Sequence, residues 1–216
     1  MKPRIGVVVS VRTNSKRLPA KAFLPINGKA SYLFLLDRIK NGLKFPLHVA
    51  TSDHWTDNFL SSNLCELGYS LYRGNEHNVF KRILTLSQIE DYEYVVRITA
   101  DCPLLSAEII NDLIDQAFSR NNWVFATTKG MHPVGIDIEI LSVIEMEKVE
   151  RCLTAYDQEH VTSYFYSHLS SDKVVYLKHP CLNIPEGKYL LDTIEDFLFL
   201  NEFMRKRDSL FPLLTK

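Results

Sequence analysis

Short apolar runs alternate with stretches of helical periodicity in the first part of this chain, and that alternation limits the folds open to it. The run over residues 5–11 is almost continuously apolar, which is typical of a strand buried on both faces. A stretch with apolar residues at helical spacing begins at Ser31, which we expect to cap a helix. Further strands are predicted over 47–51, 69–72, 94–99 and 124–128, and further helices over 53–68, 79–89 and 106–119. This order predicts an α/β fold whose mostly parallel sheet carries helices on both faces.

The second half of the chain has a less regular pattern. Strands are predicted over 135–141, 174–177 and 189–191, and helices over 143–153, 158–169 and 194–205. In the earlier helix over 53–68, Asp53 is expected to act as the cap, with Phe59, Leu60, Leu64 and Leu67 facing inward. No repeat or linker divides the 216 residues, so we predict a single domain over 1–216.

Composition excludes several classes of protein. A net charge of -1 argues against a general nucleic-acid binder, which usually carries a clear basic excess. No apolar stretch approaches the length of a membrane span, and no signal-peptide pattern opens the chain. The four cysteines form no Cys-x-x-Cys pair, which disfavours a zinc site or a redox pair. We therefore expect a cytoplasmic protein that binds neither nucleic acid nor membranes.

A cationic loop directly follows the first predicted strand. Arg12, Lys16, Arg17 and Lys21 lie within ten residues, with Ser15 between them. Arginine forks bind phosphate oxygens in pairs, lysine adds a point charge, and backbone N–H groups of a turning loop add anion contacts. We predict that Arg12, Ser15, Arg17 and Lys21 bind a polyphosphate and its leaving group, whereas Lys16 is solvated; a wholly solvated basic loop is the alternative.

Further polar residues follow the other predicted strands. Ser52 and Asp53 follow the second strand, Arg73 and Asn75 the third, and Asp101 the strand over 94–99. Ligands of open parallel sheets bind beyond the carboxyl ends of the strands, so these residues are expected to meet the cationic loop at one edge.

Asp101 and Asp192 are the candidate metal ligands. Both follow apolar runs, and magnesium commonly takes one or two carboxylates together with phosphate oxygens and water. The alternatives are that Asp101 caps a turn and that Asp192 belongs to a turn before a helix. Thr193 and Asp196 have capping-box spacing, so Asp196 is expected to be a cap.

The order of these motifs resembles a known family. The cationic motif is followed by Ala50-Thr-Ser-Asp53, Arg73-Gly-Asn75, Arg97-Ile-Thr-Ala-Asp101-Cys-Pro103, Pro133-x-Gly-x-Asp137-x-Glu139, Glu159-His-Val161 and Leu191-Asp-Thr-Ile-Glu-Asp196. Over about the first 200 residues the chain resembles the cytidylyltransferases that make CMP-activated sugar acids, such as CMP-Kdo and CMP-sialic acid synthetases, and most of all the branch named after the spore-coat polysaccharide protein SpsF.

The resemblance implies a fold, a reaction and a set of roles. It implies a three-layer Rossmann-like sheet of the nucleotide-diphospho-sugar transferase (GT-A-like) type. It also implies magnesium-dependent transfer of CMP from CTP to a 3-deoxy-2-ulosonic acid, with release of pyrophosphate, in surface polysaccharide biosynthesis. In that family, aspartates matching Asp101 and Asp192 bind the metal. One interpretation is that residues 130–190 form a smaller subdomain for the acceptor and for a homodimer contact.

Residues are also assigned to the base side and the acceptor side of the site, and for several of them two roles stay open. Ser52, Asp53, Arg73 and Asn75 are expected to border the base and ribose, although Asn75 stands where the family has Ser or Thr, and Asn78 where it has an acid. Arg82 matches an arginine of the pattern or is a surface helix residue. Asp137 and Glu139 share one strand face and could meet sugar hydroxyls or a cation, and Glu159 and His160 could line the acceptor pocket. Arg97 lies inside an apolar strand, where its charge needs a partner. A structural ion pair is the first expectation, and the carboxylate of a sugar acid is the second.

Two other functions stay open from the sequence. One is a glycosyltransferase that uses a nucleotide-sugar donor; its usual Asp-x-Asp signature is missing, because Asp101 stands alone in residues 100–103. The other is a nucleotide-binding partner in glycan assembly that has no catalytic activity. The presence of Arg12, Arg17, Lys21, Asp101 and Asp192 argues against it.

Overall fold

A seven-stranded sheet forms the centre of the protein in the computed structural model, which describes residues 3–179 and 187–206. The strands lie in the order β5-β4-β1-β6-β8-β7-β9. Their bounds are β1 (Ile5–Ser10), β4 (Leu47–Ser52), β5 (Ser70–Gly74), β6 (Tyr94–Thr99), β7 (Phe125–Thr127), β8 (Glu139–Ser142) and β9 (Val174–Tyr176). Strand β8 runs antiparallel to β6 and β7, and the other neighbours pair in parallel. The predicted mostly parallel α/β sheet is confirmed.

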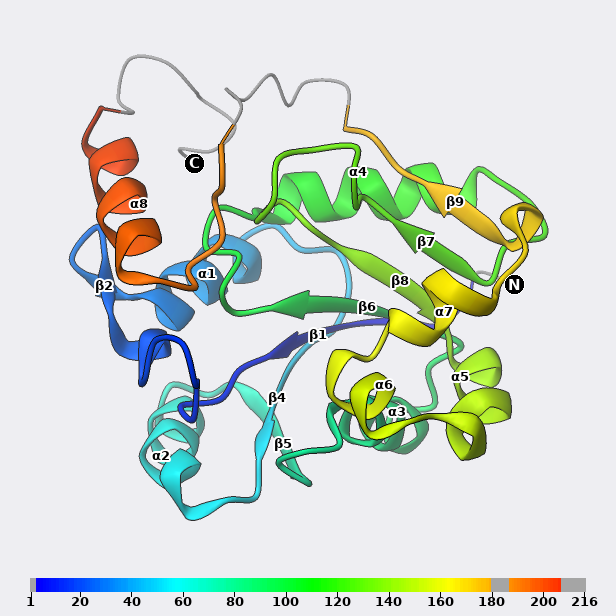
Figure 1. The fold of residues 1–216 in the computed structure, drawn as a ribbon, viewed down its shortest axis with the longest axis horizontal. Coiled ribbons are helices and arrows are strands. Elements are labelled where there is room, and N and C mark those ends of the chain that lie inside the picture. The colour runs from blue at the N-terminus through cyan, green and yellow to red at the C-terminus, as the bar shows by residue number, and fades with distance from the viewer. Residues whose placement is uncertain (1–2, 180–186, 207–216) are drawn as a thin grey trace.

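Helices cover both faces of this sheet (Figure 1). One core packs α1 (Ser31–Lys40), α2 (Asn58–Glu66), α4 (Ala107–Phe118) and α8 (Ile194–Lys206) against the sheet. The other core packs α3 (Val79–Ile89), α5 (Val143–Val149) and α7 (Ser163–His168), and α6 (Ala155–His160) lies against α3. Smaller elements are β2 (Pro25–Ile26), β3 (Lys29–Ala30) and the 3-10 helices Lys21–Phe23, Trp55–Asp57, Glu150–Cys152 and Ser171–Lys173. Strand β1 contributes to both cores, because Val7 faces one and Val8 the other.

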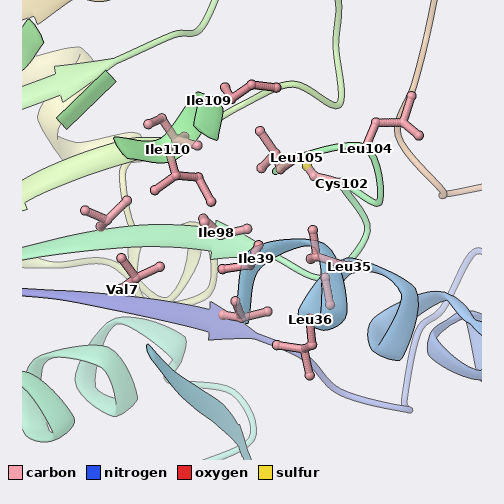
Figure 2. Close-up of a cluster of buried hydrophobic side chains, with 14 of the residues drawn as sticks. Val7, Leu35, Leu36, Ile39, Ile98, Cys102, Leu104, Leu105, Ile109 and Ile110 are labelled. Carbon is pink, nitrogen blue, oxygen red and sulfur yellow. The ribbon is translucent and has the colours of Figure 1, made fainter. Parts of the chain in front are cut away.

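The first core also holds the loop that follows β6. Figure 2 shows Leu35, Leu36 and Ile39 of α1 beside Ile98 of β6, with side chains of the loop after β6 in the same cluster. In that loop Cys102 is 1% exposed and Leu104 and Leu105 are fully buried. Burying one such leucine stabilises the fold by about 2 kcal/mol. Apolar packing of these side chains therefore holds the backbone around Asp101 in place.

Two predicted caps in the first half are wrong. Helix α1 begins at Ser31 itself, whose hydroxyl donates to the carbonyls of Lys21 and Ala22, 3.0 Å from each. Asp53 caps nothing, because the 3-10 helix Trp55–Asp57 precedes α2, which begins at Asn58. Leu60 and Leu64 are buried as expected, but Phe59, which precedes Leu60 and so lies on another face of α2, is 70% exposed. Leu67 lies beyond the last residue of α2 and is 47% exposed.

Three predictions in the second half are corrected. The strand expected over 135–141 is confined to β8, Glu139–Ser142. The helix expected over 158–169 is divided into α6 and α7 at Val161, which has a φ of 57°. Residues 189–191 form no strand; instead Tyr189 N–H donates to the Val134 carbonyl at 2.7 Å and Leu191 N–H to the Asp101 carbonyl at 2.8 Å. Those two bonds bring the segment before α8 against the end of β6.

The backbone of residues 189–190 passes very close to Gly135. Its φ is +99°, and a Cβ there would lie 2.2 Å from the Tyr189 carbonyl carbon and 2.4 Å from Leu190 N. We expect Gly135→Ala to destabilise the protein by about 3 kcal/mol or more, because backbone atoms cannot move aside without displacing residues 189–192. Chemical denaturation measures the change.

Gly130 provides the matched control for this substitution. Its φ is +78°, but a Cβ would meet nothing within 4 Å. Gly130→Ala is expected to cost only the backbone term, about 1 kcal/mol. Equal losses in the two variants would show that the contact with residues 189–190 is unimportant.

Two further expectations concern location and organisation. In the part of the chain that the structure describes, no helix combines the length and the apolar character needed to cross a bilayer.

Strands β8 and β9, which lie within residues 130–190, are part of the same sheet as the first-half strands. A separate acceptor and dimerisation role for 130–190 stays a prediction.

Candidate nucleotide and metal site

A cavity of about 420 Å³ opens at the carboxyl ends of β1 and β6. Its wall combines residues from the loop after β1, the loop after β6, helix α6 and the segment before α8. The predicted site residues that line it are Arg12, Ser15, Arg17, Lys21, Asp101, Glu159, His160 and Asp192. Lys16, expected to be solvated, lines it as well. The cationic loop and the candidate metal ligands therefore share one cavity.

Lys21 lies between the two candidate metal ligands. Its ammonium nitrogen is 2.8 Å from Asp101 Oδ2 and 3.1 Å from Asp192 Oδ1. Burial by itself would lower the pKa of Lys21, but the charges and hydrogen bonds of Asp101 and Asp192 outweigh it and raise that pKa above the ordinary value. Lys21 is therefore a charged ammonium held by two carboxylates.

Arg17 completes this cluster from the solvent side. Its guanidinium is 2.8 Å from Asp192 Oδ2, and its side chain is 74% exposed. An exposed arginine of this kind can exchange its carboxylate partner for a phosphate at low cost, because surface ion pairs contribute little. The loop can thus bring one partly buried and one exposed cation to the same anion.

The carboxylates of Asp101 and Asp192 could hold a magnesium ion. They approach one cationic nitrogen from two sides, so two hard oxygen donors converge on a position that favours positive charge. In residues 3–179 and 187–206, no group of three His, Cys, Asp or Glu side chains gathers as a metal site. Two carboxylates suit magnesium bound together with substrate phosphates and water, rather than a closed protein site.

Capping of α8 fixes Asp192. The Asp196 carboxylate accepts hydrogen bonds from the N–H groups of Thr193 at 2.8 Å and Asp192 at 3.0 Å, and Thr193 Oγ1 accepts from Asp196 N–H at 3.3 Å. The predicted cap at Asp196 is confirmed. Asp192 therefore comes from a capped helix start, and not from the strand end that its apolar flank suggested.

Arg12 pairs across the cavity with helix α6. Its guanidinium is 2.8 Å from Glu159 Oε1 and donates to the Glu76 carbonyl at 3.4 Å. The hydrogen bond from Arg12 lowers the pKa of Glu159, so this carboxylate is ionised at neutral pH. Next to it, His160 packs against Tyr156 with ring centroids 4.2 Å apart.

Sequence reasoning missed Asp57, the anchor of the cationic loop. This fully buried carboxylate accepts from Thr13 N–H at 2.8 Å, Thr13 Oγ1 at 2.6 Å and Thr51 Oγ1 at 3.1 Å. Burial raises the pKa of Asp57, but the hydrogen bonds from Ser52 and Thr13 outweigh it and leave the pKa below the ordinary value. The ionised carboxylate ties the loop to β4, and no local motif marks it because its partner is 44 residues away.

The predicted base-side residues do not line the cavity. Arg73 donates to the carbonyls of Ser52 at 2.9 Å and His54 at 3.0 Å, and Ser52 is buried against Asp57. Asn75 Oδ1 accepts from the backbone N–H groups that follow it in the β5–α3 loop. Asp53 is exposed at the same edge. Ser52, Arg73 and Asn75 thus shape the loops, and their contact with a nucleotide stays a prediction.

Neither Asp137 nor Glu139, the predicted acceptor-side pair, lines the cavity. Glu139 is buried, pairs with Arg97, and accepts from Thr162 Oγ1 at 2.8 Å and Tyr166 Oη at 2.9 Å. The ion pair expected first for Arg97 is confirmed. Asp137 lies before β8 and accepts from Gly135 N–H at 2.9 Å, and burial raises its pKa. Ile136, Ile138 and Ile140 all belong to the core packed by α1 and α4, so Asp137 and Glu139 alternate with them on the other side, and their contact with an acceptor stays a prediction.

Comparison with known proteins identifies the relatives of this chain. A family model described as cytidylyltransferase matches residues 6–203. An uncharacterized protein of Methanocaldococcus jannaschii is 32% identical over 204 residues, 93% of this chain and 83% of that protein. The spore coat polysaccharide biosynthesis protein SpsF of Bacillus subtilis is 25% identical over 209 residues, 92% of this chain and 85% of that protein.

Solved structures share the architecture. A cytidylyltransferase from Leptospira borgpetersenii superposes with a TM-score of 0.86 at 26% identity, over 96% of this chain and 89% of that one. A CMP:2-keto-3-deoxy-manno-octonic acid synthetase complexed with CTP superposes with a TM-score of 0.71 at 12% identity, over 94% of this chain and 99% of that one, and shares the fold. The family resemblance and the fold read from the sequence are both confirmed.

Proposed function

This chain belongs to the cytidylyltransferase family, and we propose that it transfers CMP from CTP to a sugar acid of the 3-deoxy-2-ulosonic type and releases pyrophosphate. We also propose that the reaction depends on magnesium and that the protein forms a homodimer. The observation that carries it is the contact of Lys21 with both Asp101 and Asp192 in the cavity that Arg12 and Arg17 also line. The Bacillus subtilis relative is named for spore coat polysaccharide biosynthesis, which supports a product used in a surface polysaccharide.

The side chains of the cavity divide the work of the reaction. Negative charge grows on the leaving pyrophosphate, and fixed cations placed there lower the barrier by several kcal/mol. Lys21 and Arg17 can supply that positive charge, because both side chains already lie in the cavity beside Asp192. Asp101 and Asp192 would hold a magnesium ion, which would supply Lewis-acid charge to the phosphates. Glu159, ionised and at the wall, can accept hydrogen bonds from acceptor hydroxyls.

Release of pyrophosphate tests the proposed function. The protein is incubated with CTP, magnesium and a panel of 3-deoxy-2-ulosonic acids, with ATP, GTP and UTP as nucleotide controls. We expect release that requires both CTP and one of the acids, and loss of release when EDTA removes the divalent cation. Hydrolysis of a nucleotide-sugar without pyrophosphate release would indicate a glycosyltransferase instead. Binding of CTP without turnover of any acceptor would indicate a partner without catalytic activity.

A further inference from the structure

The cationic loop closes on one residue, Thr13. The Thr13 carbonyl accepts hydrogen bonds from Ser15 N–H at 2.9 Å and from Ala20 N–H at 3.1 Å. The second of these bonds joins the two ends of the stretch 13–20, so the residues between them form a closed loop. Arg17 lies inside this loop and projects into solvent, with its side chain 74% exposed. The position of Arg17 therefore depends on a backbone contact that Thr13 makes.

The same closure sets the position of Lys21. Ala20, which donates to Thr13, has a left-handed backbone with a φ of 55°, and the 3-10 helix Lys21–Phe23 begins at the next residue. On its other side this helix is fixed by Ser31, whose hydroxyl donates to the Lys21 carbonyl at 3.0 Å. The ammonium that lies between the two candidate metal ligands thus extends from a backbone held at both ends.

Thr13 is itself held by the buried carboxylate of Asp57. One oxygen, Oδ1, accepts from the N–H of Thr13 at 2.8 Å and from its Oγ1 at 2.6 Å. The other oxygen, Oδ2, accepts from Thr51 Oγ1 at 3.1 Å and from Ser52 N–H at 3.2 Å. Thr13 Oγ1 also donates to the Thr56 carbonyl at 3.1 Å. Asp57 therefore joins the cationic loop through one oxygen to strand β4 through the other, and hydrogen bonds to an ionised acceptor are the stronger kind.

Thr13 can affect a ligand only through its neighbours. Neither Thr13 nor Asp57 lines the cavity, whereas Arg12 and Ser15 on either side of Thr13 do. A loop that is ordered before binding loses little conformational freedom when its ligand arrives, and this raises affinity without any new contact. The closure at Thr13 orders the loop in this way.

We propose that Thr13 is a positioning residue for the β- and γ-phosphates of the nucleotide. Held by Asp57, it closes the loop that presents Arg17 and Lys21, and so raises the affinity for a triphosphate that it does not touch. This inference rests on the proposed function. A nucleoside monophosphate lacks the phosphates that these two cations are expected to bind, so its affinity should depend little on Thr13.

Binding of CTP and CMP to Thr13→Val tests the proposal. Valine keeps the shape of the side chain but removes the hydroxyl that donates to the Asp57 carboxylate. We expect the affinity for CTP to fall about 10-fold, as for loss of one hydrogen bond to a charged group, and the affinity for CMP to change less than about threefold. Thr13→Ser keeps the hydroxyl and should bind CTP within about threefold of the wild type. Isothermal titration calorimetry measures each affinity.

Thr51→Val is the matched control for the lost hydrogen bond. Thr51 donates to the same carboxylate, but it is fully buried in β4 and does not line the cavity. This variant should lower the melting temperature about as much as Thr13→Val and should leave both affinities unchanged. If Thr13→Val loses stability like the control and keeps its affinity for CTP, Thr13 is only structural and the proposal is overturned. Equal losses of CTP and CMP affinity would overturn it too.

Amide hydrogen exchange observes the loop directly. The N–H groups of Ser15 and Ala20, which donate to the Thr13 carbonyl, should exchange about 10-fold faster in Thr13→Val than in the wild type and at the wild-type rate in Thr51→Val. Saturating CTP should slow their exchange in the wild type. Exchange at the rate of an unfolded peptide in the wild type would overturn the proposal without recourse to any variant.

Inorganic tripolyphosphate keeps this inference apart from the proposed function. If no sugar acid supports pyrophosphate release, the proposed function fails. Slower exchange at Ser15 and Ala20 with tripolyphosphate, together with weaker binding of tripolyphosphate by Thr13→Val, would then sustain the role of Thr13 in a protein with another activity. If Thr13→Val instead releases pyrophosphate with the wild-type KM for CTP, the proposed function stands and the role of Thr13 is refuted.

Discussion

Asp101→Asn is expected to lower turnover by about a thousandfold or more and to leave the fold intact. Asparagine keeps the shape of the side chain but removes the charge that, together with Asp192, draws a cation to the end of β6. The fold should survive, because Lys21 keeps Asp192 as a partner and the loop remains packed through buried Cys102 and Leu104. The measurements are steady-state pyrophosphate release and cooperative thermal unfolding.

Asp115→Asn is the control for this charge removal. Asp115 pairs with Lys44 at 3.7 Å, both side chains are about two-thirds exposed, and neither lines the cavity. The control should turn over like the wild type. If Asp101→Asn retains more than about a tenth of the wild-type rate, the carboxylate of Asp101 does not hold an essential metal ion.

Lys21→Ala is expected to weaken binding of CTP by about 10- to 100-fold while changing binding of CMP by less than about threefold. The ammonium of Lys21 is already held at the acids, where the leaving phosphates of CTP are expected. CMP lacks the β- and γ-phosphates and therefore loses little when that charge is removed. Isothermal titration calorimetry with the two nucleotides measures both affinities.

Two further variants separate charge from packing. Lys21→Met keeps most of the buried stem without the charge, so it should reproduce the selective loss of CTP affinity. Lys29→Ala removes an exposed lysine that pairs with Asp37 away from the cavity, and should change neither affinity. Equal losses of CTP and CMP affinity in Lys21→Ala would show that Lys21 only neutralises Asp101 and Asp192.

Much of the fold could be predicted because its signals are local. Strand β6 and helix α3 have the bounds that their apolar periodicity predicts. The predicted helix bounds were wrong where one stretch of sequence suits two local structures. The run from Asp53 to Gly68 suits a helix from its start, but Trp55–Asp57 forms a 3-10 turn first and α2 begins only at Asn58. The run over 158–169 suits one helix, but the backbone at Val161 divides it.

The candidate site was only partly predictable, for a related reason. Residues of the loops that follow strands, such as Arg12, Lys21 and Asp101, could be placed at one edge by the topology of a parallel sheet. The partner of Glu139 could not be predicted, because Arg97 lies on the neighbouring strand β6, 42 residues away. The burial of Arg82 is likewise invisible in the sequence, where it looks like a surface residue of a helix.

The sequence by itself determined the alternating elements, the cationic loop at the end of the first strand and the acids that could face it. Hydrophobic periodicity and strand-end position are properties of a few neighbouring residues, so they can be read without coordinates. Only the tertiary structure decided the pairings: Lys21 with Asp101 and Asp192, 80 and 171 residues away, and Arg12 with Glu159, 147 residues away. Such contacts depend on how the helices pack on the sheet and where buried charges find partners, which no local pattern records.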